Sequence, residues 1–68
     1  MKFYEAFKLL DDGKTVRVLT RGHLIYKKIK GGFSCSARNW TITGLDSIEH
    51  VATFVTLEQF QAEWEVVE

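Results

Sequence analysis

Residues 3–17 read FYEAFKLLDDGKTVR, and this stretch decides the fold. Its apolar residues recur at the i, i+3, i+4, i+7 spacing that lines one face of a helix. They are Phe3, Ala6, Phe7 and Leu10. Gly13 then supplies the left-handed residue that ends many helices, and the β-branched Thr15 and Val16 favour a strand after it. The stretch therefore predicts a helix over residues 3–12, followed at once by a strand.

The rest of the chain predicts short strands and one short helix. Apolar and β-branched runs between turns at Arg21-Gly22, Gly31-Gly32 and the Gly44 region indicate strands. These runs cover residues 14–20, 23–29, 33–36, 40–43 and 51–55. Thr56 and Gln59 have the spacing of a capping box, which predicts a helix over 56–63, and residues 64–68 resume an extended pattern. We therefore expect one α+β domain over residues 1–68: an N-terminal helix packed on a small antiparallel sheet, with a short C-terminal helix and a final strand.

The composition bounds the class of protein. At 68 residues and 46% hydrophobic content, the chain is rich in apolar side chains for its size. A domain this small buries only about 60% of its unfolded surface on folding. We therefore expect a homo-oligomer in which subunit contacts cover some of the apolar side chains. No run approaches the roughly 20 apolar residues of a membrane span, and no signal peptide is recognisable, so we expect a cytoplasmic protein without a membrane partner. The lone Cys35 predicts neither an internal disulfide nor a metal site.

The net charge of zero conceals a segregation of charges along the chain. Residues 13–45 contain no Asp or Glu. They contain His23 and seven cationic residues, namely Lys14, Arg17, Arg21, Lys27, Lys28, Lys30 and Arg38. A span of this kind creates a positive potential that suits an anionic ligand, and the alternative is a solvated face that merely lacks acids.

No catalytic or metal-binding motif is recognisable in the sequence. It has no Gly-rich phosphate loop, no GxSxG, no paired Cys motif and no HExxH, and His23 and His50 are isolated. We therefore expect a protein that is not an enzyme and needs no cofactor. Basic and aromatic residues interleave as in sheets that bind single-stranded nucleic acid, but the neutral charge and a pI near 6.7 argue against a nucleic-acid partner.

A compact nucleotide fits the pattern better than a long polyanion does. Its phosphates need two or three Arg or Lys donors, and its base needs a ring on which to stack. The predicted phosphate or ribose contacts are Arg17, Arg21, Lys28 and Arg38, and the predicted stacking residues are Tyr26 and Trp40. The alternative is that Trp40 packs in the core and Arg17 is a solvated strand residue. Because the domain is small, we expect the pocket to lie between subunits.

Both ends of the chain resemble a family of small phage proteins. The resemblance rests on the ending TLEQFQAEWEVVE and on Phe3, Glu5, Ala6, Leu10, Gly13, Lys14, Val16 and Arg17. The family is the second type of Thoeris anti-defence protein, whose members begin with a pattern like FxEAxxxLxxGKxVR and end in a short helix followed by DWEVVE. Residues 22–26, GHLIY, also resemble the next strand of the family. The family usually has a Trp where this chain has Arg21, and its longer members carry an insertion before the final helix.

The resemblance implies a homo-oligomeric sponge for signalling nucleotides. Such a protein would act in the cytoplasm of an infected host cell, where it would bind a cyclic nucleotide or cyclic ADP-ribose type immune messenger without cleaving it. The alternative is a small phage protein that inhibits a host protein by direct contact. Exposed aromatic residues such as Tyr4 and Phe33 would then be the anchors.

Overall fold

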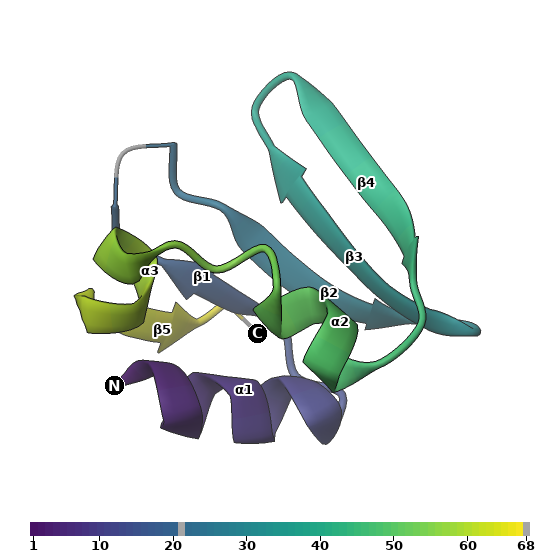
Figure 1. Cartoon of the computed structure of the whole chain (residues 1–68), viewed down its shortest axis with the longest axis horizontal. Coiled ribbons are helices and arrows are strands. Elements are labelled where there is room, and N and C mark those ends of the chain that lie inside the picture. The colour runs from purple at the N-terminus through teal and green to yellow at the C-terminus, as the bar shows by residue number, and fades with distance from the viewer. Residues whose placement is uncertain (21, 68) are drawn as a thin grey trace.

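A computed structural model describes residues 1–20 and 22–67, which form three helices and one five-stranded antiparallel sheet (Figure 1). The helices are α1 (Phe3–Asp11), α2 (Ile48–Ala52) and α3 (Leu57–Gln61), and the strands are β1 (Val16–Val18), β2 (Ile25–Ile29), β3 (Gly32–Ala37), β4 (Trp40–Leu45) and β5 (Trp64–Val66). The strand order is β4-β3-β2-β1-β5. None of the described helices is long and apolar enough to cross a membrane. The predicted α+β fold is confirmed.

Helix α1 forms and ends as its sequence predicts. Its buried residues are Ala6, Phe7 and Leu10, and its first turn is capped by Glu5, whose Oε1 accepts a hydrogen bond from the Lys2 N–H at 3.0 Å. The chain leaves the helix through Gly13, which has a φ of 99°. That left-handed conformation favours glycine because it has no Cβ.

The centre of the core is Trp64, which opens β5 and is 1% exposed. Its ring centroid lies 6.0 Å from that of Phe3, 5.7 Å from that of Phe7 and 5.5 Å from that of Tyr26. The indole Nε1 donates a hydrogen bond to the Gln59 carbonyl oxygen at 2.9 Å, and the Tyr26 hydroxyl donates to Gln59 Oε1 at 3.2 Å. One aromatic cluster therefore joins α1, β2, α3 and β5.

The prediction of a strand over residues 51–55 is wrong, because this part of the chain begins within α2. Ser47 caps the helix: its Oγ accepts a hydrogen bond from the His50 N–H at 3.0 Å. Val51 is fully buried from its helical position, and α2 packs on β3 and β4. An N-cap and one buried apolar side chain outweigh the β preference of Val51 and its neighbours, since strand propensity depends strongly on packing context.

Other boundaries differ by a few residues. The strand predicted over 14–20 is confined to β1, and the one predicted over 23–29 begins only at Ile25 because Gly22 and His23 have positive φ values of 92° and 45°. β4 extends beyond the predicted 40–43 and includes Gly44, which lies at a register shift between β3 and β4. Thr56 and Gln59 form the predicted capping box of α3, and β5 pairs with β1 as the final strand.

Cys35 and Tyr26 are register partners on β3 and β2, and both side chains lie in the core. Burial raises the pKa of the Cys35 thiol above its usual value. Burial also raises the pKa of the Tyr26 hydroxyl, and the neighbouring Cys35 adds to that shift. Both groups are therefore held in their neutral, protonated forms, since a low-dielectric interior disfavours charge.

Replacing Gly32 with alanine should weaken the β3–β4 pairing. A Cβ at this position would overlap the backbone carbonyl oxygen of Leu45, which cannot move without shifting β4. We expect Gly32→Ala to lower the free energy of unfolding by about 3 kcal/mol, measured by urea denaturation. The control is Gly31→Ala, which has open space around it but a φ of 81° and should cost only about 1 kcal/mol. Equal losses in the two variants would contradict the close approach at Gly32.

Replacing Tyr26 with phenylalanine should change how stability depends on alkaline pH. At about pH 7, the lost hydrogen bond to Gln59 should cost about 1 kcal/mol. Because the folded state holds the Tyr26 proton more tightly than the unfolded chain does, this stabilisation is complete below about pH 10 and declines as the pH rises further. Above the unfolded-state pKa of tyrosine, the Tyr26 contribution to the free energy of unfolding falls by about 1.4 kcal/mol per pH unit. At about pH 11, urea denaturation should therefore show the wild type no more stable than Tyr26→Phe. Tyr4→Phe, at an exposed tyrosine, should match the wild type at both pH values.

Candidate functional site

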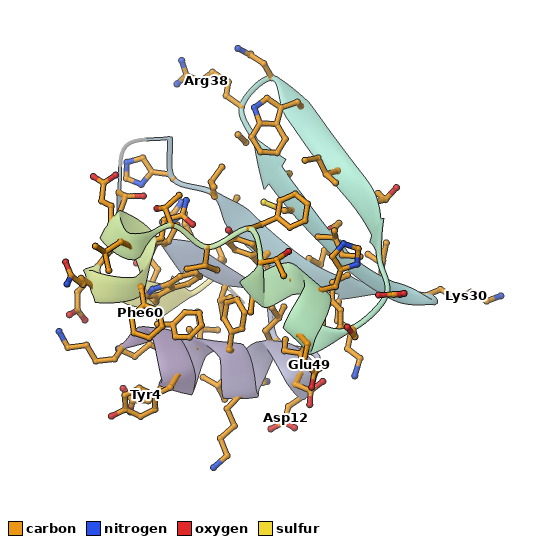
Figure 2. The ribbon with its side chains drawn as sticks, viewed as in Figure 1. Tyr4, Asp12, Lys30, Arg38, Glu49 and Phe60 are labelled. Carbon is orange, nitrogen blue, oxygen red and sulfur yellow. The ribbon has the colours of Figure 1, made fainter. Side chains whose placement is uncertain are left out.

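Two arginines predicted as ligand contacts line the same surface recess. The recess has a volume of about 520 Å³ and lies between the β1–β2 loop and the β3–β4 turn. Its lining residues are Arg17, Gly22, His23, Ile25, Ala37 and Arg38. Figure 2 shows Arg38 at the tip of the β3–β4 hairpin, beyond the part of the sheet that the helices cover. The topology thus places two guanidinium groups and one imidazole, from three segments, around one hollow.

Arg17 is held in the recess wall by a cross-strand ion pair. It lies directly opposite Glu65 in the β1–β5 register, and its Nε donates a hydrogen bond to Glu65 Oε2 at 2.7 Å while its Nη2 contacts the same oxygen. A guanidinium carries five N–H donors in a fixed fork, so this pairing leaves others available. Glu65 orients Arg17, but it also offsets part of its positive charge.

Arg38 and His23 supply the less constrained donors of the recess. Arg38 is exposed in the two-residue turn between β3 and β4, and it forms no ion pair with any residue that the structure describes. His23 is exposed in the β1–β2 loop, where its positive φ directs the chain back toward β2. His23 was not among the predicted ligand residues, although it lies in the span without acidic residues and next to the turn signal of Gly22.

The other predicted ligand residues lie outside the recess. Tyr26 is fully buried, so the expectation that its ring stacks on a ligand is wrong. Lys28 donates a hydrogen bond from Nζ to the Asp11 carbonyl oxygen at 2.7 Å, which satisfies the C-terminal end of α1 instead of a ligand. Trp40 is 46% exposed opposite Ala37, which contradicts its placement in the core, but it does not line the recess. Arg21 lies outside the described residues.

The acid-free span does not form one continuous cationic surface. Lys30 precedes β3 and Arg38 follows it, so the two side chains project from opposite ends of that strand (Figure 2). β3 has six residues, which corresponds to about 20 Å at the usual rise per residue. The C-terminal segment also returns Glu65 to the side of Arg17. Among the described residues, the formal positive charge at the recess therefore comes from Arg17 and Arg38, and His23 adds a further polar ring.

The chemistry of the recess is that of hydrogen-bond donation to an anion. Its polar side chains are two guanidinium groups and one imidazole, and its remaining side chains are small or apolar. Across residues 1–20 and 22–67, the structure places no three His, Cys, Asp or Glu side chains where they could share a metal ion. His50 pairs with Asp46 at 3.1 Å on the exposed surface, at the opposite end of β4 from Arg38.

Comparisons with known proteins do not assign this recess to a described activity. Models of protein families, curated proteins and solved structures were all compared with the chain. None of the three comparisons gives a significant match. The interpretation of the recess therefore rests on its own geometry and on the residues at the two ends of the chain.

Proposed function

We propose that this protein binds a cyclic nucleotide or cyclic ADP-ribose type messenger at the recess and sequesters it as an anti-defence protein of a phage. The observation that supports this proposal is the convergence of Arg17, His23 and Arg38 on one hollow. Phosphate groups are bound well by paired N–H donors of arginine. Three separate segments supply these donors, so one ligand can contact all of them only where the fold brings the segments together.

The size of the recess agrees with a small-molecule ligand. Its volume of about 520 Å³ lies within the range of about 300–1,000 Å³ typical of such sites. Trp40 is exposed but does not line the recess, because the strand register places it on the sheet face of Cys35 and Tyr26, opposite to the face of Arg17. Phosphates would contact Arg17 and Arg38, and the base would pack against the apolar lining residues Ile25 and Ala37.

The proposed action is sequestration without cleavage. The described residues that line the recess include no carboxylate, and Glu65, which contacts the lining residue Arg17, is hydrogen-bonded to its guanidinium. The resemblance at both ends of the chain supplies the ligand class, and the recess supplies a place for the ligand to bind.

A second candidate function is inhibition of a host protein by direct contact. The supporting observation is the exposure of Tyr4 at 71%, Leu57 at 72% and Phe60 at 55%. Tyr4 and Phe60 lie on the same side of the molecule, near the start of α1 (Figure 2). Aromatic side chains of this kind are common anchors in protein interfaces. Phe33, expected as an anchor, is 4% exposed and packs in the core, so that expectation is wrong.

Reversing the charge of Arg38 should abolish binding of the messenger. We expect Arg38→Glu to weaken affinity by about 100-fold in isothermal titration against a panel of cyclic dinucleotides and cyclic ADP-ribose isomers. The matched control is Lys30→Glu, which changes net charge equally at the other end of β3 and should leave affinity within about twofold, since charges that far apart are screened. Arg38 is preferable to Arg17 for this test because Arg17→Glu would place two carboxylates opposite each other.

Removing the acid beside Arg17 should have the opposite effect. Glu65→Gln keeps the shape of the side chain but frees the Arg17 guanidinium, so affinity for the same nucleotides should increase. Bound nucleotide released by heat should be chemically intact when analysed by mass spectrometry. Absence of binding to every nucleotide in the panel, together with a stoichiometric host partner in a pull-down that Tyr4→Ala abolishes, would replace the sponge proposal with the second function.

A further inference from the structure

The side chain of His23 makes no polar contact within the described fold. It is exposed, and it forms no hydrogen bond or ion pair with any residue that the structure describes. The residue nevertheless lines the recess together with Arg17 and Arg38. An imidazole that the fold leaves unpaired, beside two guanidinium groups, is available to a ligand in the hollow.

The backbone holds His23 at the recess in a conformation that suits glycine better. The His23 N–H donates a hydrogen bond to the Thr20 carbonyl oxygen at 3.0 Å, and the Val18 N–H donates to the Leu24 carbonyl oxygen at 3.0 Å, which closes the loop. The φ of His23 is 45°, in the left-handed region. Residues with a Cβ adopt this conformation at a cost in stability, and such residues cluster at ligand sites.

His23 is also the group through which the charge of the recess can change near neutral pH. The guanidinium groups of Arg17 and Arg38 stay protonated at every such pH. The carboxylates that come from β5 and the residue before it are both engaged, Glu65 with Arg17 and Glu63 with the N-terminal amine at 2.6 Å. Histidine, by contrast, is the side chain whose charge ordinarily changes between about pH 5 and pH 8.

We propose that His23 couples ligand binding at the recess to the uptake of a proton, so that an anionic ligand is held more tightly at about pH 6 than at about pH 8. This inference rests on the site proposed above. A phosphate in the recess stabilises the protonated imidazole, which donates an N–H to a phosphate oxygen. The proton comes from the solvent and returns to it when the ligand leaves, and because the two equilibria are linked, each favours the other.

The class of phosphate decides how clearly this linkage appears. A phosphodiester keeps its single negative charge between about pH 6 and pH 8, whereas a phosphomonoester loses a second proton near pH 6 and becomes more negative as the pH rises. Its growing charge would offset the loss of the His23 proton. The recess is therefore expected to gain affinity at low pH most clearly for ligands with internal phosphates, such as a cyclic dinucleotide.

The first test uses sulfate, an anion whose charge is constant in this pH range. Proton NMR should follow the ring signals of both histidines through a pH titration, in chloride and in sulfate at equal ionic strength. We expect sulfate to raise the midpoint of the His23 titration by about half a pH unit. His50, at the opposite end of β4 from Arg38, is the internal reference and should not shift. Arg38→Gln should abolish the His23 shift. An unmoved His23, or an equal shift at His50, would overturn the proposal.

The second test compares affinities at two pH values. Isothermal titration with a cyclic dinucleotide should give about fivefold tighter binding at about pH 6 than at about pH 8. His23→Asn should reduce this ratio to about one, since asparagine tolerates the left-handed conformation but does not titrate. The matched control is His50→Asn, which removes the other histidine and should keep the fivefold ratio. A wild-type ratio near one, or an unchanged ratio in His23→Asn, would contradict proton uptake by His23.

A third variant separates binding from folding. His23→Gly should also lose the pH dependence, yet its urea midpoint should be no lower than that of the wild type, because glycine suits a φ of 45°. A lower midpoint would show that the side chain serves the fold, and would overturn the proposal. If no nucleotide in the panel binds, the proposed function fails, and the sulfate titration still decides the role of His23.

Discussion

The burial of Trp64 is the interaction on which the rest of the structure depends. This side chain comes from almost the end of the chain, yet its ring contacts Phe3 and Phe7 near the beginning. Full burial of a large aromatic side chain stabilises a fold by about 3 kcal/mol, and only its N–H needs a partner. The Gln59 carbonyl provides that partner. Trp64 therefore fixes β5 to α1 and α3 at the centre of the contact between the sheet and the helices.

The fold could be predicted from the sequence wherever a local signal and the tertiary packing agree. The apolar face of α1, Gly13 and the capping box at Thr56 are such signals, and all three are confirmed. The prediction failed at residues 51–55, where β-branched side chains occur in a segment too short for a helical period to be visible. There the deciding factors were the cap at Ser47 and the burial of Val51, and the second of these depends on the tertiary fold.

The candidate site was only partly predictable, because the positions of charged residues in the sequence do not show where their side chains project from the fold. Arg17 and Arg38 were expected at the site and do line the recess, but β3 separates Lys30 from Arg38 by its whole length. Glu65 also pairs with Arg17, and this contact could not be predicted because the two residues are far apart in the sequence. A tyrosine can stack on a ligand at the surface or pack in the core, and the residue type alone does not distinguish the two. The structure shows that Tyr26 pairs with Cys35 on the buried face of the sheet.

The burial of Cys35 has a practical consequence for studying this protein in solution. Thiol reagents attack the thiolate, and a sulfur that is both covered and held protonated offers very little of it. A second cysteine introduced at an exposed position would therefore take up a fluorescent dye or spin label selectively, with the natural residue left in place. Distances between copies of the chain, or between a label and a bound molecule, become measurable without first redesigning the interior.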